Sequence, residues 1–113
     1  MSHQELFVTN HALVRYAERM LGMDVADVVF RAVGKRFREM EKLMVYDGQI
    51  LFAAQQVFGL DHELLAREIR RQVEPWWRVV GDARYPARFG DRRFRVVVRN
   101  AHVVTVFPTD CRG

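Results

Sequence analysis

The sequence predicts an α+β fold in which N-terminal helical hairpins pack on a C-terminal antiparallel β-sheet. Residues 1–75 carry apolar positions at helical spacing between capping signals, whereas the later residues are valine-rich and alternate between apolar and polar positions. Half of the 113 residues are hydrophobic (50%), which is enough for one domain to bury a core. We therefore expect one domain over 1–113, with a helical half at 1–75, antiparallel strands at 76–107 and a frayed tail at 108–113.

Capping residues and an apolar stripe predict the first two helices. Residues 11–21 are expected to form the first, since Thr9 is a favourable capping residue and Gly22 is a typical stop signal. Asp24 is the expected N-cap of a second helix, which runs to about Val33. These two helices form the first predicted hairpin.

The pattern then partly repeats at an offset of 37 residues. Residues 35–46 could form a short helix, and Tyr46–Gly48 is predicted to be a turn. Helices are expected at about Ile50–Phe58 and Asp61–Val73, again separated by a glycine and an aspartate cap. Pro75 is expected to end the helical half.

The strand half is expected to begin at Trp76–Val80. The next run, Arg84–Phe89, contains a proline and is predicted to be an edge strand or a loop. Two valine-rich runs follow, Arg92–Arg99 and His102–Phe107, and Asn100-Ala101 between them could make a two-residue turn. They form the clearest hairpin in the chain.

Side chains alternate between the two faces of a strand, and along Arg92–Arg99 this places charged residues on one face and apolar residues on the other. Arg93, Arg95 and Arg99 share one face, and the apolar residues on the other face should contact the helices. The three arginines are therefore candidates for contacts with a nucleic-acid backbone. A charged sheet face that only keeps the protein in solution is the alternative.

The register of the hairpin decides where Thr105 lies. A two-residue loop places Arg99 opposite His102 and Val96 opposite Thr105, whereas a three-residue loop moves Thr105 to the arginine face. We treat His102 and Thr105 as further candidate nucleic-acid contacts. The choice between the two registers stays open.

One side of the first predicted helix carries His11, Arg15, Glu18 and Arg19. At 100° per residue these four side chains fall within about a quarter turn of one another. A histidine and two arginines, with one carboxylate to orient them, suit a phosphate or a developing negative charge. A solvated helix face is the alternative.

The charge distribution favours a nucleic-acid partner. Residues 76–113 hold eight arginines, no lysine and three aspartates, whereas residues 1–75 hold ten lysines and arginines and eleven acidic residues. Arginine binds phosphate bidentately and stacks on bases, so this bias indicates RNA or another nucleic acid. A protein partner, or a codon bias without functional meaning, would also explain it.

Several classes of protein are not expected. No apolar run approaches the roughly 18 residues of a membrane span, and no secretion signal is recognisable. Cys111 is the only cysteine and the four histidines are scattered, so neither a disulfide nor a structural zinc site is expected. We expect a cytoplasmic protein without membrane contact, cofactor or metal.

Residues at both ends of the chain resemble small ribonuclease toxins of the RelE type, and more closely the uncharacterised phage and bacterial relatives of that fold. Those relatives open a helix with T-x-H-A-L-x-R-x-x-E-R, which Thr9–Arg19 matches. Their last strand pair reads F-x-V, a turn and V-V-T-V, which Phe94–Val96 and Val103–Val106 match. The resemblance covers about 45 residues.

The resemblance implies metal-independent RNA cleavage, in which the 2′-hydroxyl attacks the adjacent phosphate. His11 would be the general base or acid, Arg15 and Arg19 a phosphate clamp, and Arg95 or Arg99 a second clamp. Glu18 would orient the arginines. An antitoxin would then be a separate chain, and a homodimer is possible.

An inactive descendant of such a ribonuclease belongs to the same interpretation. The alternative is a non-enzymatic module of phage or mobile-element origin that binds nucleic acid or a host protein. The two glycine–apolar–aspartate connections superficially resemble a helix-turn-helix. The helix at about 25–33 holds one arginine and one aspartate, which argues against groove recognition. Arg67, Arg70 and Arg71 keep that possibility open for the later helix.

Overall fold

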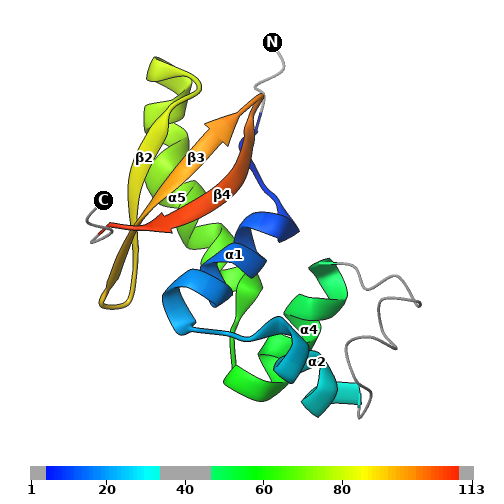
Figure 1. Cartoon of the computed structure of the whole chain (residues 1–113). Helices are drawn as coiled ribbons and strands as arrows, with labels where there is room; N and C mark the ends of the chain where they lie inside the picture. Colours follow the sequence, from blue (N-terminus) through cyan, green and yellow to red (C-terminus); the bar gives the residue numbers. More distant parts are fainter. Residues whose placement is uncertain (1–4, 34–46, 110–113) are drawn as a thin grey trace.

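The computed structural model describes residues 5–33 and 47–109, and Figure 1 shows the arrangement of its helices and strands. The elements are β1 (Phe7–Val8), α1 (Asn10–Leu21), α2 (Val25–Val33), α4 (Asp47–Phe58), α5 (His62–Val80), β2 (Arg84–Phe89), β3 (Arg92–Arg99) and β4 (His102–Pro108). The predicted α+β class is confirmed. Helices α1 and α5 lie against the sheet. Helix α4 packs on α1, and α2 packs on α4, so this pair lies away from the sheet. The helix expected at 35–46 lies outside the described residues.

The predicted caps place the helix boundaries. The Thr9 hydroxyl accepts a hydrogen bond from the Ala12 amide at 3.1 Å, and Gly22 ends α1 with a φ of 68°. Asp24 and Asp61 each accept from the amide three residues later, at 3.2 and 3.0 Å. The same capping chemistry therefore begins α2 and α5.

The turn predicted at Tyr46–Gly48 is wrong at Asp47 and Gly48, because α4 begins at Asp47. An Asp-Gly pair is common in turns, but an aspartate in the first helical turn is also stabilised by the helix dipole. In this chain the second preference prevails. Helix α4 packs on α2 and α1, with Ile50, Leu51 and Ala54 buried.

The strand predicted at Trp76–Val80 is also wrong, because α5 continues through Pro75 to Val80. Buried residues recur every four positions along α5, and Trp77 continues this apolar stripe into the core; the stripe comprises Leu65, Ile69, Val73 and Trp77. At 100° per residue Pro75 lies opposite the stripe, and it is exposed. Packing on one face thus holds the helix together where a backbone hydrogen bond is missing on the other.

The sheet has the strand order β1-β4-β3-β2. The pairs β2–β3 and β3–β4 are antiparallel, as expected, and β2 is an edge strand that accommodates Pro86. Strand β1 was not predicted and makes the sheet mixed, because Phe7 and Val8 pair in parallel with His102 and Val103. Two residues are too few to produce a periodic signal.

Pro108 belongs to β4 rather than to the frayed tail predicted from that residue onward. It lies opposite Phe94 at the end of the strand. Thr109 donates its amide to Arg93 O at 3.4 Å, so the neighbouring Pro108 directs its nitrogen away from β3. Its missing donor therefore costs no hydrogen bond to β3.

The β3–β4 hairpin closes with the predicted two-residue turn, in which Asn100 and Ala101 both have positive φ (50° and 63°). Arg99 lies opposite His102, but Thr105 lies opposite Val97 and not Val96. The register shifts between Val97 and Val98, which leaves an extra residue on β4. This bulge turns Thr105 to the arginine face without a longer loop.

Candidate nucleic-acid interface

The face of the sheet turned away from α1 and α5 carries five exposed arginines. They occupy outward-facing positions of β2 and β3, which alternate with residues buried against the helices and which Pro86 and Val97 share; the five are Arg84, Arg88, Arg93, Arg95 and Arg99. We call this surface the arginine face. The sequence prediction that Arg93, Arg95 and Arg99 share one face agrees with these strand positions.

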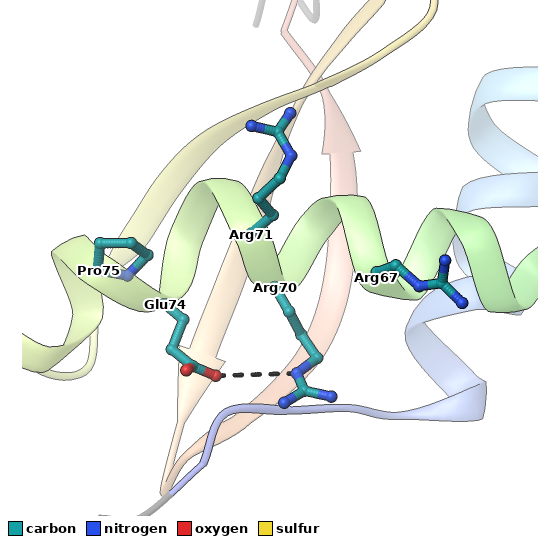
Figure 2. A pocket seen from close by; sticks show the side chains of 5 residues that line it. All are labelled: Arg67, Arg70, Arg71, Glu74 and Pro75. Carbon is teal, nitrogen blue, oxygen red and sulfur yellow. Dashed lines mark ion pairs between the residues drawn. The ribbon is translucent and has the colours of Figure 1, made fainter.

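No carboxylate neutralises the arginine face. Among the described residues, none of its five arginines lies within ion-pair distance of an aspartate or glutamate. Elsewhere the pattern is different: Arg71 lies 2.7 Å from Glu68, and Arg70 is directed toward Glu74 at 3.8 Å (Figure 2). Within residues 5–33 and 47–109, most arginines without a carboxylate partner therefore lie on the sheet.

Two of these arginines lie directly opposite each other. Arg88 and Arg93 are partners in the β2–β3 ladder. Like charges at opposed positions destabilise a sheet pair. Arg88 Nε donates to the Gly90 carbonyl at 3.1 Å, but no described carboxylate pairs with either guanidinium group. A bound anion between the two guanidinium groups would remove this repulsion.

An aromatic ring lies at one end of the arginine face. Phe107 is opposite Arg95 on β3, with the Arg19 guanidinium 4.7 Å and the Arg84 guanidinium 6.0 Å from its ring centroid. A cavity of about 380 Å³ opens there and is lined by Arg84, Arg95, Phe107, Pro108 and Thr109. Charged and apolar groups thus meet at one hollow in the surface.

The other end of the face also has an aromatic pair. Phe7 of β1 is 58% exposed, and its ring lies edge-on to His102 at a centroid distance of 5.6 Å. His102 Nδ1 lies 2.6 Å from Asn100 O and therefore donates its proton to that carbonyl. The Nε2 atom of His102 is left free of hydrogen bonds to the described residues.

The polar side of α1 forms a separate network with α4. His11 Nδ1 lies 3.4 Å from Asp47, and Arg15 donates from Nε to His11 Nε2 at 3.3 Å and from Nη1 to Glu18 at 3.0 Å. Because the Arg15 Nε–H can only donate, His11 Nε2 must accept, so Nδ1 carries the imidazole proton toward Asp47. Asp47 and Arg15 thus fix the ring of His11 from both sides.

Arg19 connects this helix to the sheet. Its Nη1 donates to Thr105 Oγ1 at 3.0 Å and to the Val106 carbonyl at 2.8 Å. No hydrogen bond or ion pair among the described residues joins His11, Arg15 or Glu18 to the sheet arginines. The structure therefore groups the predicted site residues into two sets, with Arg19 beside Thr105 and Phe107.

Sequence reasoning missed four residues of these two sets: Arg84, Arg88, Asp47 and Phe107. The alternation of Arg84 and Arg88 with buried residues in β2 was a signal that could have found them. Asp47 was assigned to a turn. In a regular strand Phe107 would lie on the buried side, and only the bulge brings it outward.

No family model matches this chain, and no curated protein or solved structure matches it either. Over residues 5–33 and 47–109, no helix is long and apolar enough to span a membrane. In the same part of the chain, no three histidine, cysteine or acidic residues group together as metal ligands.

Proposed function

We propose that the chain binds single-stranded RNA on the arginine face. Its five arginines contact the phosphates, and Phe107 provides a surface on which one base stacks. The observation that carries this proposal is the set of arginines that face solvent without any carboxylate partner, around an accessible aromatic ring.

The open sheet surface of the interface favours single-stranded RNA over a double helix. Groove recognition needs a helix or ribbon that projects into the groove, whereas unstacked bases lie against open sheets that carry aromatic and arginine side chains. Of the three α5 arginines considered for groove recognition, Arg70 and Arg71 pair with glutamates, whereas Arg67 has no ion pair among the described residues. The sheet offers the larger uncompensated charge.

The salt dependence of binding tests this proposal. With a fluorescent single-stranded RNA of about 12 nucleotides, within the usual footprint of such sheets, log K should fall linearly with log salt concentration. Each phosphate contact contributes about −0.7 to that slope, so Arg95→Gln and Arg93→Gln should each make it shallower by about 0.7. Fluorescence anisotropy at several salt concentrations measures both quantities.

Arg31→Gln is the matched control. Arg31 lies on α2, away from the sheet, and pairs with Asp27 at 3.0 Å. The substitution removes the same charge and should leave the salt slope unchanged. An equal loss of slope in Arg31→Gln, or no loss in the sheet variants, would contradict the proposed interface.

The Asp47–His11 pair favours a second candidate, the metal-independent ribonuclease. A carboxylate at Nδ1 holds the imidazole so that Nε2 can exchange a proton with the 2′-hydroxyl or the leaving oxygen. In the free protein Arg15 occupies Nε2. A phosphate bound by Arg15 would draw its guanidinium away from Nε2 and leave that atom available.

Cleavage of a mixed-sequence RNA in EDTA tests this second candidate. His11→Ala should lower the cleavage rate by at least about 100-fold, the usual scale for a general base or acid. His62→Ala on α5 is the matched histidine control and should keep the rate. If wild type binds RNA with the expected salt slope but does not cleave it, the ribonuclease is wrong and the binding function stands.

A further inference from the structure

A second cavity lies on the helix side of the sheet, away from the arginine face. It has a volume of about 530 Å³ and is lined by residues from the second half of α1, the connection before α5 and the β2–β3 turn; they include Tyr16, Leu21, Leu60, Phe89, Asp91 and Arg92. Its size falls in the range of small-molecule sites.

Tyr16 is a buried residue with an unused hydrogen-bonding group at this cavity. It is 1% exposed, and its ring packs edge-on against Phe94 and Phe89 at centroid distances of 5.1 and 6.2 Å. Its hydroxyl forms no hydrogen bond with any described residue. Among the described residues, His62 Nδ1 is the only buried side-chain polar atom without a partner, so solvent reaches the Tyr16 oxygen and the hydroxyl is available to an acceptor that enters the cavity.

Burial raises the pKa of the Tyr16 hydroxyl, and the nearby positive charge of Arg92 only partly opposes this. The phenol therefore keeps its proton at neutral pH and can act as a donor. A neutral donor beside a guanidinium is suited to an anionic acceptor.

Arg92 supplies the positive charge at the cavity. It is the first residue of β3 and shares the face of Phe94, so its side chain reaches toward the helices and donates from Nη1 to Met20 O at 2.8 Å. A guanidinium has five N–H donors, and no described carboxylate pairs with this one. The remaining donors of Arg92 are available to a ligand.

We propose that this cavity binds a small monocarboxylate with an apolar, ring-sized body. The carboxylate accepts hydrogen bonds from the Tyr16 hydroxyl and the Arg92 guanidinium, while the body contacts Leu21, Leu60 and Phe89. Asp91 also lines the cavity, and its carboxylate disfavours a second negative charge on the ligand. This site does not depend on the RNA interface, because Arg92 and Arg93 extend from opposite faces of β3.

Titration with phenylacetate tests the proposal on the full chain. Saturable binding is expected by calorimetry, with amide NMR shifts confined to Gly90 and its neighbours. Phenylacetamide, which has the same body without the charge, should bind about tenfold more weakly or worse, as should the variant Tyr16→Phe. Arg93→Gln removes a charge at the neighbouring position and should leave the affinity unchanged.

Tyr16→Phe keeps the ring packing and deletes only the hydroxyl that has no partner, so it should fold with an unchanged thermal midpoint in the absence of ligand. Arg92→Gln is the second variant and should also lose affinity about tenfold. The proposal is wrong if phenylacetate shows no saturable binding, or if both variants bind it as wild type does. Competition by RNA would also contradict it, because the two sites are separate.

Discussion

Arg19 has a structural position that a phosphate clamp alone does not explain. Its guanidinium binds Thr105 and the Val106 carbonyl and lies over the Phe107 ring. Strand β1 pairs with β4 only at His102 and Val103, so this arginine covers part of the edge of β4 that β1 leaves open. Arg19 therefore holds the β4 edge and supports one side of the ring that we propose binds a base.

The neighbouring Thr105 shows how one extra residue can change the composition of a surface. In a regular strand Thr105 and Phe107 would lie on the buried face, and Val106 would lie outside. The bulge reverses this, and Val106 is buried while Phe107 is partly exposed. Alternation in the sequence cannot locate such a bulge, because the pattern remains apolar on both sides of it.

At the scale of elements, α5 shows which interactions prevail when local and tertiary preferences conflict. Pro75 removes a backbone donor, and the pairs Trp76-Trp77 and Val79-Val80 favour a strand. The stripe that ends at Trp77 is buried against the sheet, and Arg78 pairs with Glu74 across the proline at 2.7 Å. These contacts keep the segment helical.

Pro75→Ala should therefore stabilise the protein. Alanine restores an amide that can donate to Arg71 O and removes the ring from an exposed helical position (Figure 2). We expect the free energy of unfolding to rise by about 1–2 kcal/mol, less than the full helix-propensity difference because proline also restricts the unfolded chain. Urea unfolding measures this. A lower urea midpoint would show that the proline bend itself is needed for packing.

The elements that the sequence predicts well have local causes. Glycine and aspartate caps mark the connections at Gly22–Asp24 and Gly59–Asp61, and alternation places the arginines of β3. Strand β1 has no comparable signal. It is held by the backbone, with Phe7 donating its amide to Ala101 O at 2.8 Å, and this partner lies at the other end of the chain.

The candidate site also combines residues that local sequence predicts with residues that only long-range contacts bring together. The spacing of His11, Arg15, Glu18 and Arg19 in the sequence is enough to predict that they share one side of α1. It does not predict the Asp47 carboxylate beside His11, because α4 approaches α1 only through tertiary packing. Local periodicity thus predicts which side chains share a face, and the long-range contacts decide which of them meet.

At the scale of the whole molecule, charge is separated between the two faces of the sheet. On α1 and α5, the helices that cover one face, Arg15, Arg70, Arg71 and Arg78 pair with glutamates of the same helix. The strands expose unpaired arginines on the other face. This asymmetry would orient the protein toward a polyanion before contact, with a rate that falls as salt increases.

Glu74 joins distant parts of the chain and should make folding sensitive to acid. Its carboxylate accepts from the Leu6 amide at 3.1 Å and from Arg78 at 2.7 Å, which ties the segment before β1 to α5. Burial raises the pKa of Glu74, but the hydrogen bonds from Arg78 and Leu6 and the nearby positive charges together leave it below its usual value.

A pKa that is lower in the folded state favours folding above the unfolded pKa of about 4.3, and this contribution is lost as pH falls through the folded value. Wild type should thus lose the stability that this group contributes as pH falls below about 5. Glu74→Gln should flatten that part of the profile and lower stability at pH 7. Urea midpoints from about pH 3 to 7 test this, with the exposed Glu63→Gln on α5 as control. If Glu74→Gln follows the wild-type acid profile, then the carboxylate charge does not hold the N-terminal segment against α5, and the backbone pairing of β1 suffices.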